Sequence, residues 1–568
     1  MGEGAWLSLL LWLPLFGALL LYFMRDADDR QCYHIALFTS LLVFMASLGT
    51  LALLDPHPVT RFGLEEMYTW LPSLHASWHL GMDSLSLWLV LLTTFLVPLA
   101  IRSSFGQATP TNYRTFLMLI LGLETALIGV FISLDLVLFY IFWEAVLIPM
   151  YFLIGIWGGA SRINSANKFF VYTMMGSLLM LLAIFALWHA SEAKSFDYLV
   201  LLQDPGIRAL PEGAQWWLFG AFALAFAIKV PVWPFHTWLP DAHTDAPTAA
   251  SILLAGVLLK MGTYGLLRFN LPLFPLGYEQ WRWTIGGLAV IGIVYGAWVA
   301  TAQTDLKRLV AYSSVSHMGF VVLGIMAANV IGTTGATLQM INHGITTGAL
   351  FMLVGFLYDR CHTREISSFQ GIIQVMPVYA ICFWITLFAS IGLPGLNGFV
   401  GEFMIFIGSG QATREYTVIA ITGVIWGAIY MLWVFQRVFL GKVDRSGPNG
   451  SLKDLDRHEF ETILPLLILM VVLGIASPII SGPLQPTMRR IVERIHPAPA
   501  MAVVVVEPAT PAATPAEPAP ATEPVMEPAI TEPAAEPTAT TPSGTPPTDT
   551  TPPAATPPAD DATEAGHD

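Results

Sequence analysis

The chain has 568 residues, of which 55% are hydrophobic and 12% are charged, and its formal net charge at pH 7 is −14. Its mean hydropathy of +0.63 excludes an ordinary soluble protein and indicates a polytopic membrane protein. Eleven acidic residues and no Lys or Arg follow residue 496, so the rest of the chain carries only −3. No basic surface for nucleic acid is therefore expected.

Cofactor motifs are not found in the sequence. The three cysteines, Cys32, Cys361 and Cys382, form no Cys-x-x-Cys pair, so we expect neither iron–sulfur ligation nor another metal site in this chain. A strand-linked Gly-x-Gly-x-x-Gly and a P-loop are also missing, which argues against nucleotide binding. The first 29 residues lack a basic n-region and a small-residue cleavage site, and so predict a first membrane helix rather than a signal peptide.

Apolar stretches of membrane-spanning length recur along the chain. They fall near residues 6–24, 33–54, 82–101, 114–133, 135–157, 166–188, 216–230, 248–268, 283–301, 309–327, 331–358, 377–409, 416–440 and 461–482. The sequence therefore predicts an all-α polytopic membrane protein with about 14 transmembrane helices. The stretch 55–80 is too polar to span, and we expect it to cap one face as a hairpin.

The basic residues predict the orientation. If the N-terminus lies outside, the inner loops hold fifteen Lys and Arg residues, against nine in the outer loops and the C-terminal flank. Because cytoplasmic loops are enriched in Lys and Arg, this count favours both termini on the outer side. We therefore expect a multi-pass protein of the bacterial inner (cell) membrane with both termini on the periplasmic side.

Residues 221–260 place two lysines inside apolar helices. Lys229 ends one helix, before Pro231 and Pro234 break it, and Lys260 lies in the next helix, which starts near Pro247. The short polar turn predicted between them carries His236, Asp241, His243 and Asp245. Each lysine lies about 20 Å along its helix, near the middle of a hydrocarbon core about 30 Å thick. A buried amine there can bind and release a proton; the alternative, a lysine that snorkels to the headgroups, is disfavoured by this depth.

A second broken helix is predicted in the twelfth stretch. Its middle contains Gly392, Pro394, Gly395, Asn397 and Gly398, and Glu402 follows directly. The freed backbone groups need partners, so we expect this break to line protein or a wet cavity and not to face lipid. The breaks beside Lys229 and Glu402 lie five helices apart, an odd number, which predicts two inverted five-helix repeats with discontinuous helices 7 and 12.

The predicted domain organisation follows from these breaks. It comprises helices 1–3 with the outer loop (1–113), the first inverted repeat of helices 4–8 (114–269), the second of helices 9–13 (282–440), the last helix with its flanks (441–494), and a Pro/Ala/Thr/Glu-rich tail (495–568). The composition of the tail cannot bury a core, so we expect it to be disordered.

Six ionisable residues lie on six different apolar helices. They are Glu144, Lys229, Lys260, His317, His343 and Glu402. Each histidine alone is as readily explained as a hydrogen-bonded packing residue, but six such groups at mid-depth are what a proton relay requires. Glu124 and Asp83 are weaker candidates because each is expected near an end of its helix, and Asp135 is expected to cap its helix.

Four long motifs resemble a known family. They read FWEAVLIPMYFLIGIWGG, FAIKVPVWPFHTWLPDAHTDAPTAASILLAGVLLKMGTYGLLRF, DLKRLVAYSSVSHMGF and GLPGLNGFVGEF. The chain resembles, over about residues 1–490, the antiporter-like subunits of proton-pumping NADH–quinone oxidoreductase, respiratory complex I, which are related to subunits of multi-subunit sodium/proton antiporters. The resemblance implies a fourteen-helix core with inverted repeats, a Glu144–Lys229 pair, and a connection from Lys260 through the histidines to the terminal acidic residue Glu402. An acidic residue at that last position fits one branch of the family, whereas the others usually carry lysine.

The resemblance also implies a function. It predicts a proton-translocating subunit of an NADH:quinone oxidoreductase that holds no redox centre itself, while NADH, FMN, iron–sulfur clusters and quinone bind elsewhere in the complex. The implied partners are the neighbouring subunits L and N, other membrane subunits and the lipid bilayer. A subunit of a multi-subunit sodium/proton antiporter is the alternative, because both functions need the same relay residues. A purely structural spacer is disfavoured, since each buried ionisable group costs stability.

Overall fold

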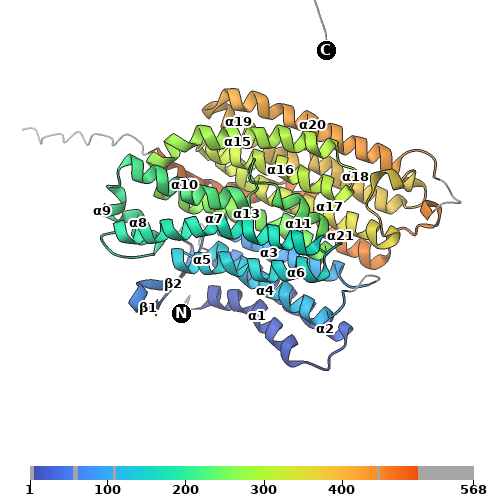
Figure 1. The fold of residues 1–568 in the computed structure, drawn as a ribbon, viewed down its shortest axis with the longest axis horizontal. Coiled ribbons are helices and arrows are strands. Elements are labelled where there is room, and N and C mark those ends of the chain that lie inside the picture. The colour runs from blue at the N-terminus through green and yellow to red at the C-terminus, as the bar shows by residue number, and fades with distance from the viewer. Residues whose placement is uncertain (1–4, 55–61, 107–109, 444–447, 497–568) are drawn as a thin grey trace, which may run out of the picture. The chain divides into compact units, whose positions relative to one another are not determined.

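Long helices that run side by side make up nearly all of the structure, a computed structural model that describes residues 5–54, 62–106, 110–443 and 448–496 (Figure 1). The described residues belong to one structural unit, Met1–Met501. The predicted disordered tail, residues 495–568, lies outside the described residues from 497 onward.

The elements follow in chain order. The first part contains α1 (Trp6–Phe23), α2 (Asp29–Leu53), β1 (Leu64–Leu71), η1 (Pro72–Leu74), β2 (Ala76–Met82), α3 (Ser84–Ser103), α4 (Tyr113–Ile132), α5 (Leu136–Ala145), α6 (Leu147–Trp157) and α7 (Arg162–Ala190). The middle part contains α8 (Tyr198–Gln203), α9 (Pro205–Arg208), α10 (Glu212–Lys229), α11 (Trp238–Asp245), α12 (Thr248–Leu253), η2 (Leu254–Leu258), α13 (Leu259–Gly265), η3 (Leu266–Asn270), α14 (Leu271–Leu273) and α15 (Pro275–Thr301). The last part contains α16 (Leu306–Met326), α17 (Val330–Cys361), η4 (Ile366–Ser368), η5 (Ile372–Gln374), α18 (Pro377–Ser390), α19 (Asn397–Ala412), α20 (Arg414–Phe439), η6 (Pro448–Ser451), α21 (Arg457–Ile475) and α22 (Pro478–Ile495).

The predicted all-α polytopic class is confirmed. Among the described residues, twelve helices are long and apolar enough to cross a membrane, with α5 and α6 counted as one and α12 through α14 as another. The broken pairs α10/α11 and α18/α19 add two discontinuous spans, at the places predicted for helices 7 and 12, and bring the number to the fourteen predicted. The division into inverted repeats at 114–269 and 282–440 stays a prediction.

Polar residues at helix starts behave largely as expected. Asp135 caps α5 by accepting hydrogen bonds from the backbone N–H groups of Val137 and Leu138, at 2.9 and 3.2 Å. Asp83 caps α3 in the same way. The expectation that Glu124 lies near a helix end is wrong: α4 extends eleven residues before it and eight after it, because no breaker interrupts the apolar stretch before Ser133.

The hairpin predicted within residues 55–80 is confirmed for its described part. Strands β1 and β2 pair antiparallel, with Leu64 opposite Met82. The carboxylate of Glu66 accepts hydrogen bonds from the backbone N–H groups of Leu7 and Ser8, so the hairpin holds the start of α1. Residues 55–61, the rest of the predicted loop up to the hairpin, lie outside the described residues.

The end of the described chain differs from the prediction. The last apolar span was expected over 461–482, but α21 ends at Ile475 and a second helix, α22, begins at Pro478. Proline lacks a backbone N–H and fits the first turn of a helix, so a new helix begins there. One face of α22 is apolar and packs against α3, α14, α15 and α17; its buried residues include Ile480, Leu484, Met488, Ile491 and Ile495.

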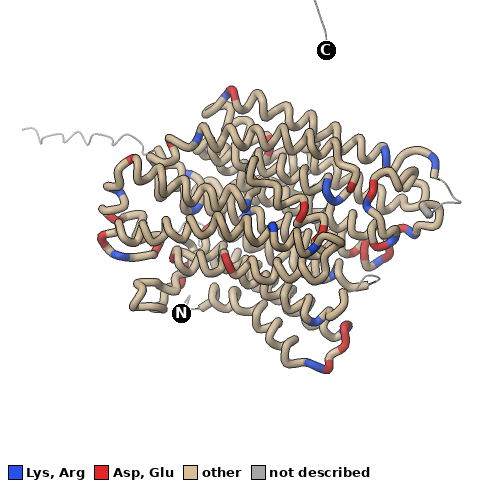
Figure 2. The backbone as a smooth tube through the Cα atoms, viewed as in Figure 1, with Lys and Arg blue, Asp and Glu red and all other residues tan. Residues whose placement is uncertain are grey.

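Charged residues gather at the ends of the helices. Figure 2 shows most Lys, Arg, Asp and Glu at the two ends of the bundle and few along its length. Lys229 and Lys260 are exceptions, because both residues lie in the interior of the molecule, where they are 1% and 0% exposed. The basic and acidic residues that remain in the interior therefore mark the region where a site can be sought.

Candidate functional site

The break in helix 7 places Lys229 at the last position of α10. Pro231 and Pro234 cannot continue the helix, and the indole N–H of Trp238 donates to the carbonyl oxygen of Ile228 at 2.7 Å. This bond satisfies one of the carbonyl groups that every helix end leaves unpaired. The predicted polar turn is wrong from Trp238 onward, because the helix α11 forms there and packs against α7 and α16.

Lys229 is surrounded by aromatic rings. Its ammonium lies 5.4 Å from the ring centre of Trp143 and 5.3 Å from that of Phe169. The Nζ atom has no hydrogen-bond partner among the described residues, and the same holds for Oε1 of Glu144. No hydrogen bond or ion pair joins Glu144 to Lys229 among the described residues, so their pairing stays a prediction.

Lys260 makes direct contacts in the centre of the molecule. Its Nζ atom donates to the carbonyl oxygen of Ala255 at 2.5 Å and lies 2.7 Å from Nδ1 of His343. The surrounding helix α13 is flanked by the π-helical segments η2 and η3, and such bulges are frequent at functional sites. Lys260 and His343, predicted on separate helices, thus form one hydrogen-bonded pair.

The same series continues to Glu402. The ring centres of His343 and His317 are 5.9 Å apart, and Nδ1 of His317 lies 3.2 Å from Oε1 of Glu402. The amide of Gln339 donates to the same carboxyl oxygen at 3.1 Å. Four of the six predicted site residues therefore form a buried sequence from α13 through α17 and α16 to α19.

A small polar cavity lies beside the two histidines. Its volume is about 10 Å³, which is room for about one water molecule. It is lined by His317, Gln339, Asn342, His343, Thr346 and Thr347 and by Ala389, Ser390 and Gly398 of the helix-12 break. A water there would have polar partners on both rings.

The break in helix 12 is held by hydrogen bonds to α17. The amide of Asn342 donates to the carbonyl oxygen of Asn397 at 2.6 Å, and Asn397 returns a bond to Asn342 at 3.3 Å. Gly392 and Gly395 have φ of +72° and +94°, which favours glycine. Leu393, Pro394 and Gly395 are exposed in this chain by itself. The expectation that the break lines protein or a wet cavity and does not face lipid therefore stays a prediction.

Two buried histidines were not included in the predicted relay. His236 is 2% exposed and His243 is fully buried, and neither ring has a hydrogen-bond partner among the described residues. The ring of His243 stacks on Phe351 with centres 4.4 Å apart. Both residues were read as members of an open polar turn. The apolar residues around them, Trp238, Leu239 and Ala242, were the signal that could have placed His243 inside a packed helix.

The contacts of α11 fix this part of the site. Lys168 donates to Asp241 at 2.6 Å, and Arg364 donates to the carbonyl oxygen of Thr244 at 2.6 Å. The ammonium of Lys307, which is 5% exposed, donates to the carbonyl oxygen of Ala246. These bonds tie α11 and the turn that follows it to α7, α16 and the chain after α17.

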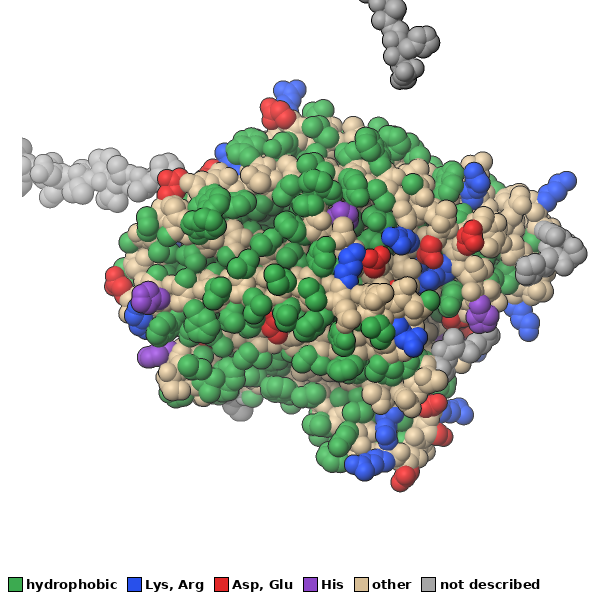
Figure 3. Space-filling model, in the orientation of Figure 1, with side chains coloured by type: hydrophobic (Ala, Val, Ile, Leu, Met, Phe, Trp, Pro, Cys, Tyr) green, Lys and Arg blue, Asp and Glu red, His purple; other side chains and the backbone are tan. Residues whose placement is uncertain are grey.

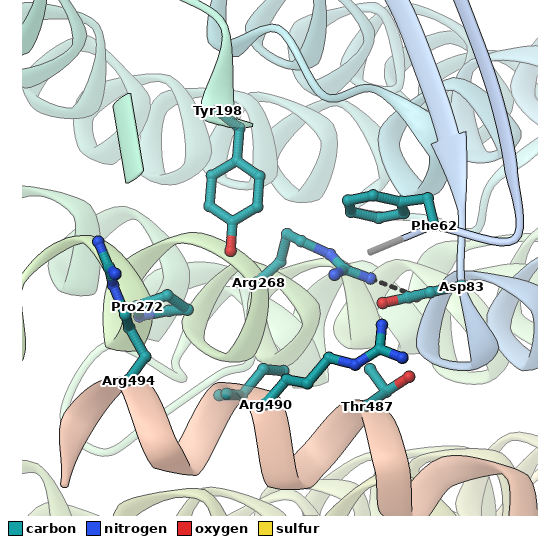
Figure 4. A pocket seen from close by; sticks show the side chains of 9 residues that line it. Phe62, Asp83, Tyr198, Arg268, Pro272, Thr487, Arg490 and Arg494 are labelled. Carbon is teal, nitrogen blue, oxygen red and sulfur yellow. Dashed lines mark hydrogen bonds and ion pairs between the residues drawn. The ribbon is translucent and has the colours of Figure 1, made fainter. Parts of the chain in front are cut away.

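The opposite end of the Lys260 helix is closed by a buried ion pair. Arg268 donates to Asp83 at 2.5 Å, and both side chains are at least 94% buried. Figure 4 shows this pair beside a pocket of about 40 Å³, with Arg490 and Arg494 of α22 and Tyr198 around it. Arg268 lies eight residues after Lys260, about 12 Å along the helix, so the pocket is separate from the contacts of Lys260.

Comparison with known proteins identifies the family. Residues 133–428 match the family model described as the transmembrane region of NADH:quinone oxidoreductase and Mrp antiporters, and residues 59–130 match the amino terminus of NADH-ubiquinone oxidoreductase chain 4. The chain is 43% identical over 502 residues to NADH-quinone oxidoreductase subunit M of Rhodobacter capsulatus, a match that covers 86% of this chain and 97% of the relative. The chain belongs to this family. A second family member, NADH-ubiquinone oxidoreductase chain 4 of Chondrus crispus, is 41% identical over 81% of this chain and 92% of its own length.

Solved structures of the NADH:quinone oxidoreductase/Mrp antiporter family have the same fold. A chain of respiratory complex I from Thermus thermophilus is 32% identical, with a TM-score of 0.77 over 86% of this chain and 99% of that chain. A chain of the Mrp complex from Dietzia is 17% identical with a TM-score of 0.74, which shows the fold alone. The relatives named NADH-quinone oxidoreductase subunit M from Rhodobacter capsulatus and Rickettsia prowazekii match 86% and 83% of this chain.

Proposed function

We propose that this chain is the subunit M type of proton-translocating membrane subunit in an NADH–quinone oxidoreductase. The observation that carries the proposal is the buried series Lys260–His343–His317–Glu402, with hydrogen-bond distances of 2.7 and 3.2 Å at its two ends. Each of these groups can take up and release a proton, and burial of four such groups in one line has no structural benefit that would offset its cost.

The proposed mechanism assigns a role to each half of the site. Glu144 holds a proton on Lys229 while its carboxylate is near and charged, and a loss of that charge lets Lys229 release the proton. Lys260 passes a proton to Nδ1 of His343 along their 2.7 Å contact. The cavity beside His343 and His317 provides the next step, and Glu402 accepts the proton from His317 and delivers it at the helix-12 break.

The redox chemistry is assigned to other subunits. We propose that this chain holds no redox centre, and that NADH, FMN, iron–sulfur clusters and quinone bind elsewhere in the complex. Among the described residues, no group of three His, Cys, Asp or Glu side chains is arranged to hold a metal ion, which is consistent with this proposal. The chain then works as a translocase that is driven through its contacts with its neighbours.

Two lateral surfaces are proposed to contact subunits L and N. Glu144 is only half-buried and lies on a face of α5 and α6 where Ile141 and Ile148 are 43% and 59% exposed. Hydrophobic side chains cover this side of the molecule (Figure 3). A carboxylate at this depth and the exposed tip of the helix-12 break are both unfavourable against lipid, so neighbouring protein chains are the better cover for both places.

The proposed location is the bacterial inner membrane, with both termini on the periplasmic side. The bias of fifteen against nine basic residues supports this orientation. The fourteen spans, an even number, support a location of both termini on the same side.

Lys229→Ala tests the proposed function. We expect the variant complex to assemble with its flavin and iron–sulfur clusters, and NADH–quinone turnover and proton pumping to fall about tenfold or more, because the switch residue is lost. Lys442→Ala, which truncates an exposed lysine after α20, is the matched control and retains most of the activity. Full pumping by an assembled Lys229→Ala complex would contradict the proposal. Purification without flavin and iron–sulfur partners, with sodium-dependent proton exchange, would favour the antiporter alternative.

A further inference from the structure

Glu124 is a buried carboxyl group that the relay does not use. Its side chain is 0% exposed in the middle of α4, and neither carboxyl oxygen has a hydrogen-bond partner among the described residues. An ionised carboxylate in such surroundings is strongly unfavourable, and the neutral acid is the form that they tolerate. Buried polar groups without partners are rare in native proteins, so Glu124 requires an explanation.

The geometry of α4 directs Glu124 toward the Lys260 helix. Phe131 lies seven residues, about two turns, after Glu124 and therefore on the same face of α4. The carbonyl oxygen of Phe131 accepts a hydrogen bond from Tyr264 at 2.9 Å, and the two rings are 5.3 Å apart. This face of α4 therefore packs against α13, the helix that carries Lys260 one turn before Tyr264.

Glu124 and Lys260 also reach a similar depth. The fourth and eighth spans cross the membrane in the same direction, so both residues lie on the inner side of the Phe131–Tyr264 contact. Along α4, Glu124 lies about 10 Å before Phe131, and along α13, Lys260 lies about 6 Å before Tyr264. The side chain of Lys260 bends further in that direction, because its Nζ atom reaches back to the carbonyl oxygen of Ala255.

Few other charges are available to Glu124. Of the elements that pack against α4, α1 and α6 carry no Asp, Glu, Lys, Arg or His. The charged and histidine residues of α2 and α3, and Arg114 of α4 itself, lie close to helix ends, and β2 carries His79 in the hairpin. At mid-depth this leaves Glu144 on α5, which lies near Lys229, and Lys260 on α13. Lys260 is the only cation of this set near the depth of Glu124.

We propose that Glu124 is a further proton-binding site, which serves Lys260 as Glu144 serves Lys229. In the step proposed, the O–H bond of the Glu124 acid breaks and an N–H bond forms at the neutral Nζ of Lys260, which gives a carboxylate and an ammonium. The reverse step restores the neutral Glu124 acid and the neutral Lys260 amine. In that state Lys260 has no extra proton to pass to His343. This inference rests on the proposed function, because it assigns a partner to one of its relay residues.

Glu124→Gln in the assembled complex tests the inference. Glutamine keeps the size but cannot carry the proton, so we expect pumping and turnover to fall about tenfold and the pH dependence of turnover to change. Glu124→Asp retains part of the activity and the normal pH dependence. Thr125→Val, a neighbour on α4 whose hydroxyl donates to the carbonyl oxygen of Leu121 in the same helix, is the matched control and retains activity.

Infrared difference spectra provide a readout other than activity. Reduction of the complex by NADH changes the carbonyl band of a protonated carboxylic acid if Glu124 exchanges its proton, and this band is lost in Glu124→Gln. Normal pumping and an unchanged carboxylic-acid band in Glu124→Gln would overturn the inference and leave Glu124 as a packing residue. The proposed function would survive that result if Lys229→Ala still abolishes pumping, so the two failures are distinguishable. If Glu124→Gln does not assemble, the carboxylic-acid band and the activity of Glu124→Asp are measured instead. A carboxylic-acid band at the same position as in the unchanged protein overturns the inference, and a shifted band supports it.

Discussion

Glu402 receives two hydrogen-bonding side chains, His317 and Gln339, on a single carboxyl oxygen. If it delivers the proton at the end of the relay, Glu402→Gln pumps very little, because an amide cannot be protonated and deprotonated near neutral pH. Glu402→Asp retains most of the activity because it keeps the chemistry and shifts the carboxyl by one methylene. Glu402→Lys retains part of the activity, since an amine can also exchange a proton. Proton pumping and NADH–quinone turnover of the three assembled variants are the measurements.

A structural role for Glu402 predicts a different order of the same variants. Glutamine also accepts hydrogen bonds from His317 and could hold the broken helix equally well. Near-normal pumping by Glu402→Gln, together with a strong loss in Glu402→Asp, would therefore assign Glu402 to the scaffold and remove it from the relay.

His79 is expected to make the hairpin sensitive to pH. Its ring contacts Asp197 through Nδ1 and Glu65 through Nε2, the latter at 2.9 Å. Burial lowers the pKa of His79, but the hydrogen bonds and charges of Asp197 and Glu65 outweigh it and raise the pKa above its ordinary value of 6.5. The stabilisation is therefore fully present below the unfolded-state pKa and is lost as the pH rises through the raised value in the folded protein.

The pH effect can be measured as protection of the hairpin. We expect hydrogen exchange of β1 and β2 to become faster as the pH rises above neutral, after correction for the intrinsic exchange rate. His79→Gln removes this dependence and lowers protection at acidic pH, with a loss of about 1.5–3 kcal/mol for the charged hydrogen bonds. His75, on the turn of the hairpin, offers the control His75→Gln. A pH dependence that persists in His79→Gln would assign it to another group.

At the scale of elements, the Asp83–Arg268 pair joins the start of α3 to the Lys260 helix, beside α22. Asp83→Leu leaves the buried guanidinium without its partner and is expected to destabilise the subunit by about 3–5 kcal/mol. Arg268→Met in the same chain removes the unpaired charge, so the double variant is expected to recover much of this loss. The melting temperature of the assembled complex measures both. A double variant as unstable as Asp83→Leu would show that the loss comes from the cap of α3, where Asp83 accepts from Ser86.

The sequence predicts the elements whose signals are local. Proline and glycine mark the breaks beside Lys229 and Glu402, and apolar length marks the spans, so these were correctly placed. The polar composition of residues 236–245 concealed α11, because its burial against α7 and α16 depends on contacts distant in sequence. The separate helix α22 after Pro478 and the mid-helix burial of Glu124 depend on tertiary packing in the same way.

The sequence also predicts which residues are ionisable but not how they connect. Lys260, His343, His317 and Glu402 were predicted as members of one relay, and the structure gives their order. Among the described residues, Lys229 is hydrogen-bonded neither to Glu144 nor to Lys260. The distances between these residues follow from the packing of the six helices that carry them, which no periodicity along the sequence reveals.

At the scale of the whole molecule, residues after 496 are expected to be dispensable. All six relay residues and all fourteen spans precede residue 497, and the remaining stretch is rich in Pro, Ala, Thr and Glu. A deletion from Pro497 onward should therefore leave assembly and pumping intact. The matched control is a deletion from Pro478 onward, which also removes α22 and exposes the surfaces of α3, α14, α15 and α17 that its apolar face covers, and should impair assembly. Native gel electrophoresis and proton pumping measure both deletions. Loss of the complex after the shorter deletion would show instead that the C-terminal stretch docks onto another subunit.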